Sequence, residues 1–506
     1  MRWSVRANRE TVRELVIRVR AHAPLIVCET EEEDRVITLL EAAAIEASVP
    51  LVVWRAHVGI SRPTDERGMA GTEDPLAALA HIESENRETL FHLRGFEETL
   101  RDAKVLSQFQ EVLRKFKSHK GAIVLSGSLI DLPASLEAYA SHFRLPPPTV
   151  EEYRELVSGV IQEAQAQART QGNTIQVQMF ESDITELCHR LRGIPFERAR
   201  QVLLRAIARD GQLSREDFEE IQEEKRAILS RSGVLSHVES PQDLSQVAGL
   251  STFKDWVKKR TRSFKEPEAA KKFNLSTPRG VLLIGVQGCG KSLAAKAVAG
   301  EWQIPIVRLD PANLFSKYVG ETEKTLRRAL ESVDAMSPLV LWVDEIEKAF
   351  SPSSDNDGGV AKRIFGTLLS WLQEHTTPVF LVATANDIAS MPPEMLRKGR
   401  FDEIFFVDLP EKEQRIELFR IHLAKRGRIL DEESLMEIAA ATEGFSGSEI
   451  EQSVIGALHT AFSSDTELSG EQILAEIHAT RPLSVTMSER ISELREWAEG
   501  RAVRAD

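Results

Sequence analysis

The octapeptide GVQGCGKS (285–292) constrains this chain more than any other stretch of its sequence. It fits the pattern G-x-x-x-x-G-K-[ST] of a phosphate-binding loop, and it lies between an apolar run, VLLIG, and the helix-forming LAAKAVAGEW. In that order of strand, loop and helix, backbone N–H groups and a helix N-terminus converge on a phosphate. The sequence therefore predicts an α/β domain that binds a nucleotide.

Each residue type in the loop has a chemical reason to be there. Glycines let backbone N–H groups turn inward around the β-phosphate, where a Cβ would obstruct them. The lysine neutralises the β- and γ-phosphates, and the serine hydroxyl is a ligand for Mg²⁺. The predicted nucleotide-binding set of this loop is Gly285, Gly288, Cys289, Gly290, Lys291, Ser292 and Leu293, with Ser292 also a metal ligand.

A second apolar run, LVLWVDE (339–345), ends on two carboxylates. Such a run is usually only a strand that leaves the core, but downstream of a phosphate loop it has the form of a Walker B element. Asp344 can then orient the water shell of the Mg²⁺, and it joins both the nucleotide-binding and the metal set. Glu345 can polarise the attacking water and is a catalytic candidate.

Two further segments carry catalytic candidates. VATAN (382–386) is a predicted strand that ends on Asn386, whose amide can contact the γ-phosphate and hold the water. LRKGRFDEIF (396–405) carries Arg397 and Arg400. These arginines are either a solvated basic turn or a pair delivered to the nucleotide of a neighbouring subunit, where they stabilise charge in the transition state.

In this order and spacing, GVQGCGKS, VDE, TAN and RKGRFD resemble the AAA family of ATPases. The resemblance implies an α/β fold with a P-loop AAA+ core, which is a parallel sheet with flanking helices, and then a helical lid. The stretch GFSGSEI (444–450) resembles the start of a lid helix, and the backbone around VAGL (247–250) would lie near the adenine. ATP and Mg²⁺ are the implied cofactors.

The resemblance also implies a ring of identical subunits, commonly six. Within it, Asn386 would be the sensor, and Arg397 and Arg400 would act across the subunit interface. Two residues depart from the family pattern, Lys398 before GRFD and Glu403 after FD, and they weaken the assignment of the two arginines.

The stretch SKYVGETEK (316–324) matches the pore loop of the same family through Tyr318, Val319 and Gly320. An exposed Tyr-Val pair on a mobile loop would wedge against an extended polypeptide with little sequence preference. The alternative is an ordinary surface tyrosine in a turn. The position of the stretch after PIVRLD favours the pore loop, and with it a protein substrate.

Apolar runs and helical stretches divide the chain into segments. Four short apolar runs (PLIVCE, VPLVVW, ETLFHL, GAIVLS) and later five more (GVLLIGV, PIVRLD, PLVLWVDE, PVFLVATAN, EIFFVDLP) alternate with helical stretches, as in parallel α/β sheets. The predicted domains are a degenerate AAA-like α/β domain (1–150), a helical lid-like domain (151–230), a linker (231–248), an AAA+ ATPase core (249–411), a helical lid (412–480) and a charged C-terminal helix or tail (481–506).

The repeated order of sheet and helices indicates an internal duplication. Slid without a gap over LLIGVQGCGKS, the stretch LIVCETEEEDR (25–35) places Glu33 on the last glycine and Asp34 on the lysine of the loop. In the Walker B position, LFHLRGFEE has Arg94 and Gly95. Clustered carboxylates repel an anionic nucleotide, so we expect this first module not to bind ATP. The alternative is an unrelated α/β domain with an acid-rich first helical turn.

Along nearly its full length, the chain resembles one AAA group encoded in algal chloroplast genomes and in cyanobacteria and other bacteria. That group pairs a diverged N-terminal module with one intact ATPase. The match is carried by LIVCETEEEDR, REDFEEIQEEKRAIL, VAGLSTFKDWVKKR and LVLWVDEIEKAF. The resemblance indicates the chemistry, ATP hydrolysis, and leaves the substrate open.

The charge balance narrows the partners. The chain of 506 residues has 64 Lys and Arg against 78 Asp and Glu, a net charge of −14. That balance disfavours nucleic acid and membrane surfaces, because affinity for both is mostly cationic. Its three cysteines have no ligand spacing, so no zinc site is implied. No apolar run is long enough to span a membrane, and the N-terminal MRWSVRANRETVRELV lacks the apolar segment of a signal peptide. We expect a cytoplasmic protein.

Three functions compete. The first is a ring-forming motor that remodels or threads a protein, and the second is a slow ATP-dependent assembly switch or scaffold. The third is a nucleic-acid motor, through the locally basic KDWVKKRTRSFK (254–265), whose plainer explanation is a solvated helix. Loss of function on mutation of Tyr318 separates the first from the second.

Overall fold

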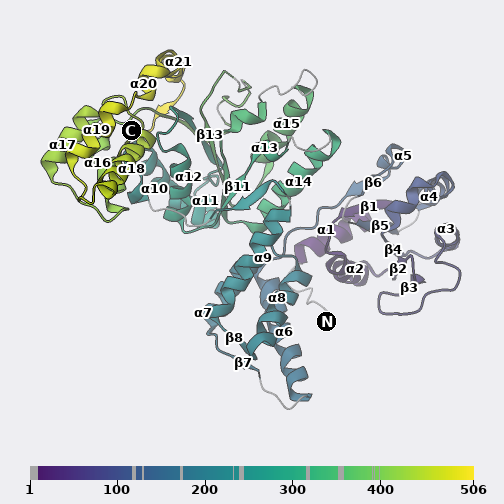
Figure 1. The fold of residues 1–506 in the computed structure, drawn as a ribbon. Helices are drawn as coiled ribbons and strands as arrows, with labels where there is room; N and C mark the ends of the chain where they lie inside the picture. The colour runs from purple at the N-terminus through teal and green to yellow at the C-terminus, as the bar shows by residue number, and fades with distance from the viewer. Residues whose placement is uncertain are drawn as a thin grey trace. The chain divides into compact units, whose positions relative to one another are not determined.

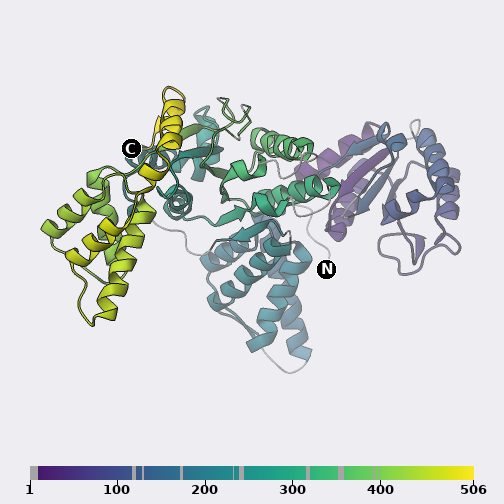
Figure 2. The same ribbon diagram turned by 45° about the horizontal axis from the view of Figure 1, so that its top comes forward.

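The computed structural model describes residues 9–116, 121–127, 130–170, 175–231, 233–238, 244–314, 319–350, 358–389, 391–392, 394–397 and 399–506. The chain divides into two compact units, Met1–Glu224 and Lys225–Asp506 (Figures 1 and 2). The division falls within one helix, α9 (Phe218–Arg231).

The first unit is built on a six-stranded sheet with the strand order β3-β2-β4-β5-β1-β6. β3 runs antiparallel to β2, and all the other neighbours are parallel. Its strands are β1 (Leu25–Glu29), β2 (Leu51–Arg55), β3 (Gly59–Ser61), β4 (Leu90–Arg94), β5 (Ala122–Gly127) and β6 (Ala140–His142).

Helices cover both faces of this sheet. Alternate side chains of a strand point to opposite faces, so Ile26 and Cys28 of β1 pack in the core formed with α1 and α2, and Leu25 and Val27 pack in the core formed with α3 and α4. The helices are α1 (Arg9–Arg20), α2 (Glu33–Ala47), α3 (Pro75–Ser84), α4 (Ala103–Phe116), the short α5 (Ala134–Glu137) and the 3₁₀ helix η2 (Phe96–Arg101).

The remainder of the first unit is mostly helical. α8 ends where Gly211 adopts a left-handed φ of 74°, which a residue without a Cβ accepts readily. The elements are α6 (Val150–Thr170), β7 (Gln176–Val177), α7 (Glu181–Leu191), α8 (Phe196–Asp210), β8 (Gln212–Leu213), η3 (Arg215–Asp217) and the start of α9.

The second unit contains a seven-stranded sheet with the order β15-β14-β10-β13-β12-β11-β9. β9 is antiparallel to β11, and the other neighbours are parallel. The strands are β9 (Leu235–His237), β10 (Gly280–Gly285), β11 (Ile306–Leu309), β12 (Leu339–Val343), β13 (Val379–Ala385), β14 (Glu403–Val407) and β15 (Val503–Arg504).

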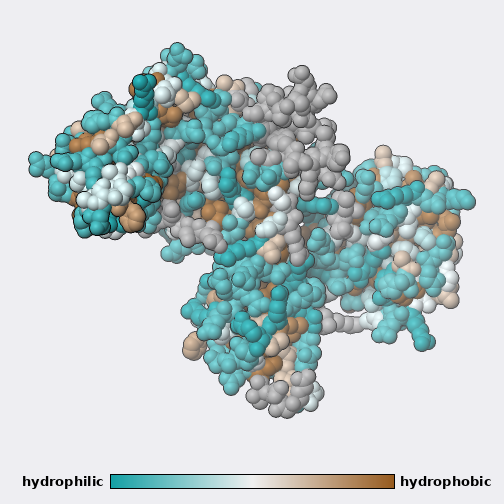
Figure 3. All heavy atoms as spheres, viewed as in Figure 1, coloured by the Kyte–Doolittle hydropathy of each residue, from teal (hydrophilic) through white to brown (hydrophobic). Residues whose placement is uncertain are grey.

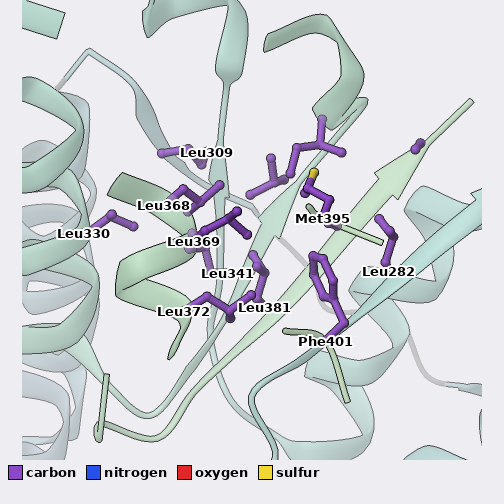
Figure 4. Close-up of a cluster of buried hydrophobic side chains, with 14 of the residues drawn as sticks. Leu282, Leu309, Leu330, Leu341, Leu368, Leu369, Leu372, Leu381, Met395 and Phe401 are labelled. Carbon is purple, nitrogen blue, oxygen red and sulfur yellow. The ribbon is translucent and has the colours of Figure 1, made fainter. Parts of the chain in front are cut away.

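Both faces of this sheet are also buried, which is why its strands are continuous apolar runs. Val281 and Leu283 pack with α10 and α12 on one face, and Leu282 and Ile284 pack with α14 and α15 on the other. Figure 4 shows this second core, in which Leu341 and Leu381 of the sheet lie against leucines of α15. The helices are η4 (Leu244–Gln246), α10 (Ser251–Lys265), α11 (Pro267–Lys272), α12 (Lys291–Trp302), α13 (Pro311–Leu314), α14 (Val319–Met336), η5 (Ile346–Phe350) and α15 (Gly358–Glu374).

Four helices with a core of their own follow the second sheet. Three of them begin at a side-chain cap that the sequence supplies, Asp431, Ser446 and Ser469, each accepting a hydrogen bond from a backbone N–H of the first turn. The helices are α16 (Lys412–Ala424), α17 (Glu432–Ala441), α18 (Gly447–Ser463) and α19 (Gly470–Ala479), and after them come α20 (Leu483–Thr486) and α21 (Ser488–Ala498).

The two sheets have the same topology. Written from the same edge, the orders are β6-β1-β5-β4-β2-β3 and β14-β10-β13-β12-β11-β9, with β15 added outside β14. The antiparallel edge strand comes from different parts of the chain, because β3 directly follows β2 whereas β9 precedes β10. This shared order supports the predicted duplication.

Two segments differ from their predictions. The stretch 231–248, expected to be a linker, contains the edge strand β9. This strand is only three residues long (LSH) and pairs with β11 on one side. The tail, expected to end as an exposed helix or tail, continues beyond α21 into β15, which pairs with β14. Ala505 then donates its N–H to Phe406 O at 2.9 Å and is 1% exposed.

Within the described residues, no helix is long and apolar enough to cross a bilayer. The surface visible in Figure 3 is predominantly hydrophilic, and its apolar residues are scattered among polar ones.

Candidate functional site

The phosphate-binding loop lies between β10 and α12, as predicted. Gly285 ends the strand at a φ of 152°, and a Cβ there would lie 1.9 Å from Val407 O of the neighbouring strand. Gly290 precedes the first helical residue with a left-handed φ of 86°, and open space lies where its Cβ would be. The loop therefore requires glycine at position 285 because the neighbouring strand is too close for a Cβ, and at position 290 because the backbone is left-handed. The loop ends at a helix N-terminus, where a phosphate can bind.

Lys291 is the first residue of α12 and is 6% exposed. Its Nζ donates hydrogen bonds to Gly285 O at 2.9 Å and Val286 O at 2.7 Å. Burial lowers the pKa of this ammonium to about 8. A desolvated cation at the mouth of an amide-lined loop is well placed to meet phosphate oxygens.

The remaining predicted loop residues have different environments. Burial raises the pKa of the Cys289 thiol to about 12, and its Sγ contacts Gln287 O at 3.8 Å. Cys289 and Leu293 both pack against the core beneath α12. Gly288 O accepts a hydrogen bond from Ser448 N at 3.0 Å, so the first turn of α18 lies on the loop. The start of the predicted lid helix and the phosphate loop thus form one site.

The predicted Walker residues come together at the carboxyl edge of the sheet. Ser292 Oγ donates to Asp344 Oδ1 at 2.9 Å. Asn386 Nδ2 donates to Glu345 Oε1 at 2.9 Å. Four residues from three separate segments therefore form two adjoining pairs, one suited to a metal and one to a water molecule.

The donor set fits a magnesium nucleotide. A hydroxyl and a carboxylate are hard oxygen ligands of the kind that Mg²⁺ prefers. Among the residues that the structure describes, no group of three or more His, Cys, Asp or Glu could hold a metal by itself. Mg²⁺ is usually bound through one or two carboxylates together with substrate phosphates and water.

Several further residues near the site were not predicted from the sequence. Thr384 Oγ1 donates to Asp344 at 2.7 Å, and Glu347 Oε1 accepts from Asn386 N at 2.9 Å. Lys348 forms an ion pair with the second oxygen of Glu345, which raises the pKa of the lysine. The alternation of a strand gave a signal for Thr384, because residues 384 and 386 share a face. Nothing in the sequence distinguished the other two.

The structure leaves the remaining predicted residues away from these pairs or undescribed. Arg397 is exposed and Arg400 is partly exposed, and neither guanidinium forms a hydrogen bond or ion pair with a described residue of this chain. Tyr318 lies outside the described residues. Val319 and Gly320 are the first residues of α14.

In the first unit, the corresponding place is filled by the protein's own charges. The connection from β1 to α2 is residues 30–32, shorter than the 286–290 of the phosphate loop, so the gapless alignment does not extend to the helix. Glu33, the first residue of α2, pairs with Arg94 at 2.7 Å, and Arg94 also pairs with Asp34 at 3.3 Å. The charges are exchanged relative to the second unit, where the helix carries the cation and the strand leads to the anions.

A second contact of this loop bridges the sheet domain and the helical domain of the first unit. Arg35 is 4% exposed, and its guanidinium donates to Pro146 O at 2.6 Å and to both oxygens of Glu152 at 3.2 and 3.3 Å. Glu32 Oε1 accepts the N–H of Phe196, the first residue of α8, at 2.9 Å. These two side chains of the loop region thus hold α6, α8 and the connecting segment. We call them the Glu32/Arg35 bridge.

Comparison with known proteins gives the family. The family described as "ATPase family associated with various cellular activities (AAA)" matches residues 281–409. "SpoVK-like AAA ATPase, N-terminal domain" matches 11–145, and "SpoVK-like AAA ATPase, second domain" matches 151–232.

Similar proteins extend over nearly the whole chain. An "Uncharacterized AAA domain-containing protein ycf46" from Pyropia yezoensis is 35% identical over 495 residues, which are 97% of this chain and 98% of that protein. The protein of the same name from Trieres chinensis is 36% identical over 500 residues, 97% of both chains. The "Cell division cycle protein 48 homolog" of Archaeoglobus fulgidus is 37% identical over 191 residues, 37% of this chain and 26% of that protein.

These matches agree with the geometry of the loop, the Walker carboxylates and the repeated sheet. The predicted family, fold class and enzyme class are confirmed. The chain belongs to the AAA ATPases, with SpoVK-like N-terminal domains and with similarity to ycf46 proteins over nearly its whole length, and it is an ATP-hydrolysing enzyme.

Proposed function

We propose that the second unit hydrolyses ATP with Mg²⁺ at the loop between β10 and α12. Lys291 and the loop N–H groups bind the phosphates, and Ser292 and Asp344 hold the metal. A bound Mg²⁺ would neutralise charge on the β- and γ-phosphate oxygens. The observation that carries the proposal is the pair of hydrogen bonds that joins Ser292 to Asp344 and Asn386 to Glu345.

In this proposal, Glu345 takes the proton of the attacking water while Asn386 holds the water in line. Both oxygens of Glu345 are engaged, one with Asn386 and the other with Lys348. Each carboxylate oxygen keeps a second lone pair, so a water molecule can still donate to Glu345 while both contacts are in place.

We further propose that copies of this chain form a ring, commonly of six, in which Arg397 and Arg400 act on the nucleotide of a neighbour. Their support is that both guanidinium groups are accessible and unpaired within the described residues of this chain. An arginine supplied in trans stabilises charge on the transferring phosphoryl group.

The ring predicts that the ATPase rate per subunit rises with protein concentration. Arg400→Ala is expected to lower the maximal rate by at least about 100-fold, since a trans-acting arginine contributes 10³–10⁵ in the best-studied cases. The decisive measurement is complementation. Glu345→Gln subunits keep Arg400 and Arg400→Ala subunits keep the base, so mixing two inactive proteins should restore part of the activity.

Arg420→Ala is the matched control for this experiment. Arg420 is exposed and Arg400 partly exposed, but Arg420 pairs with Glu432 within its own lid. Its removal should therefore leave the rate within about twofold. A rate independent of concentration, with no recovery on mixing, would contradict the ring.

We propose that hydrolysis remodels or threads a protein substrate. Rotation of the lid relative to the core would move Tyr318, Val319 and Gly320 against an extended polypeptide. The first unit would recruit that substrate or stabilise the ring. A cytoplasmic location and the absence of nucleic acid as a partner are parts of the same proposal, because the charge of −14 disfavours anionic partners.

A slow assembly switch is the second candidate. The ion pair between Glu345 and Lys348 favours it, because a base that is held by a cation has little basal activity until a partner releases it. Replacing Tyr318 by alanine separates the two candidates. It should abolish substrate remodelling by a motor at an unchanged basal ATPase rate, and it should leave a switch unaffected.

The pKa of Lys291 predicts that nucleotide binding takes up a proton at alkaline pH. In the free protein the ammonium loses its proton near pH 8, whereas bound phosphates favour the charged form and raise that pKa. Affinity for ADP should therefore fall as pH rises through about 8, and uptake should grow from nearly none at about pH 7 toward one proton.

Calorimetric titration with ADP in buffers of different ionisation enthalpy measures this uptake without hydrolysis. Lys291→Arg is the control, because a guanidinium stays charged throughout this range. The same pH-dependent uptake in the arginine variant would assign the proton to another group.

A further inference from the structure

One buried hydroxyl at the end of β13 holds both Walker B carboxylate residues. Thr384 is 1% exposed. Its Oγ1 donates to Asp344 Oδ1 at 2.7 Å and accepts the backbone N–H of Glu345 at 3.0 Å. A hydroxyl has a single hydrogen. Thr384 therefore donates to Asp344 alone and uses a lone pair to accept from Glu345.

The backbone of Glu345 is held in an uncommon conformation. Its φ is 49°, in the left-handed region that residues with a Cβ rarely adopt. The hydrogen bond from its N–H to Thr384 ties this turn to the neighbouring strand, and the side chain then reaches Asn386 at 2.9 Å. The direction of the Glu345 carboxylate thus depends on the hydroxyl of Thr384.

Asp344 depends on the same hydroxyl. Its Oδ1 accepts from Ser292 at 2.9 Å and from Thr384 at 2.7 Å. Once the hydroxyl of Ser292 turns to a metal, as the proposed function requires, it no longer orients this carboxylate. Thr384 is then the remaining hydrogen-bond donor to Oδ1, while Arg308 forms an ion pair with Oδ2 at 3.7 Å.

We propose that Thr384 is a positioning residue for ATP hydrolysis. Through two hydrogen bonds it fixes Asp344 toward the metal and Glu345 toward the water, and it makes no contact with the nucleotide itself. This inference rests on the proposed function, because it assigns Thr384 a role through residues whose own roles are proposed there.

The duplicated fold supplies an internal comparison. In the first sheet, Ser126 pairs in register with Arg94, the residue at the end of the strand that corresponds to β12. Its buried hydroxyl contacts His92 at 2.7 Å and Glu33 at 3.3 Å. A hydroxyl thus stands at the same place in both sheets, but only in the second does it hold Walker B carboxylates.

The test compares Thr384→Val, which keeps the shape and removes the hydroxyl, with Thr384→Ser, which keeps the hydroxyl. In the full chain, the valine variant should lower kcat about 10- to 100-fold with KM for ATP within about threefold, because misplacement of catalytic groups affects the chemical step. The Mg²⁺ concentration that half-saturates equilibrium binding of ADP, measured without hydrolysis, should rise by at least about threefold, since the hydroxyl of residue 384 no longer orients Asp344. The serine variant should retain kcat within about threefold.

Ser126→Ala is the matched control, and it should leave kcat and the Mg²⁺ dependence within about twofold of the wild type. Thermal unfolding checks that each variant folds, and Thr384→Ala repeats the test if the valine variant does not. A purely structural role would lower stability without moving the Mg²⁺ midpoint.

The outcomes separate this inference from the proposed function. The positioning role is overturned if Thr384→Val matches the wild type in kcat and Mg²⁺ midpoint, or if Thr384→Ser loses activity as fully as valine. If the wild type itself hydrolyses no ATP, or if Glu345→Gln hydrolyses it normally, the proposed function fails instead.

Discussion

Replacing Glu345 by glutamine is expected to lower kcat by about 10²–10⁴-fold, the range that general base catalysis contributes. Glutamine has the same size and can still accept the hydrogen bond from Asn386 through Oε1. It cannot take a proton from water. Among the residues that the structure describes, Glu345 forms hydrogen bonds or ion pairs with Thr384, Asn386 and Lys348 and none with the phosphate-binding loop. ATP should therefore still bind, and the protein should accumulate in the nucleotide-bound state.

Single-turnover hydrolysis and equilibrium binding of a fluorescent ATP analogue measure the two effects separately. Glu97→Gln is the matched control, because Glu97 lies in η2, which follows β4 as η5 follows β12 and Glu345. It should leave the rate within about twofold. A Glu345→Gln protein that hydrolyses ATP at the wild-type rate would show that another group activates the water.

Replacing Arg35 by methionine is expected to destabilise the first unit by about 3–5 kcal/mol, the usual cost of removing one partner from a buried ion pair. Arg35 and Glu152 have side chains that are 4% and 9% exposed. Without the guanidinium, the carboxylate and Pro146 O lose their charged donor in a place that water barely reaches. The contacts of α6 with the sheet domain should loosen first.

Hydrogen exchange of peptides from α6 and α8, followed in urea, measures this loss in the full chain. Arg94→Met is the control: the side chains of Arg94 and Glu33 are 25% and 24% exposed, so its removal should cost about 1 kcal/mol or less. Replacing Arg35 and Glu152 together by methionine and leucine should recover part of the stability, because the buried carboxylate of Glu152 is no longer left unpaired, whereas Glu32, 16% exposed, still loses its charged partner. Equal losses for Arg35→Met and Arg94→Met would contradict a special role for the bridge.

The main strands could be predicted because the strands of a parallel sheet that is covered on both faces have continuous apolar sequences. All nine runs that the sequence shows are strands in the structure, from β1 to β14. The missed strands lie at the edges and are short, as in β3, β9 and β15. An edge strand pairs on one side only and needs little apolar side chain, so a polar LSH or a terminal VR gives no periodic signal.

The centre of the site was predictable for a related reason. A phosphate loop requires glycine and lysine at fixed spacing, so the sequence motif by itself predicts phosphate binding. Glu347 acts through a contact with the neighbouring strand and Lys348 through a contact within its own turn, and no residue spacing in the sequence indicates either one. The gapless alignment of the first unit went wrong at its loop, because the connection from β1 to α2 is shorter than the phosphate loop that it was matched to. A deletion in this connection cannot be located from sequence similarity, because the residues directly beside it differ between the two units.

Because of the Glu32/Arg35 bridge, we expect the stabilities of the two units to depend differently on the concentration of ATP. A ligand that binds a folded domain adds RT ln(1 + [L]/Kd) to its stability, about 2.7 kcal/mol at a hundredfold excess over Kd. In the second unit, the proposed nucleotide site lies where the phosphate loop meets the lid, so a bound nucleotide would stabilise that connection. In the first unit, side chains of the chain itself make the corresponding connection, and their effective concentration is fixed by the covalent structure. We therefore expect a fall in ATP to lower the stability of the second unit and to leave that of the first unit unchanged.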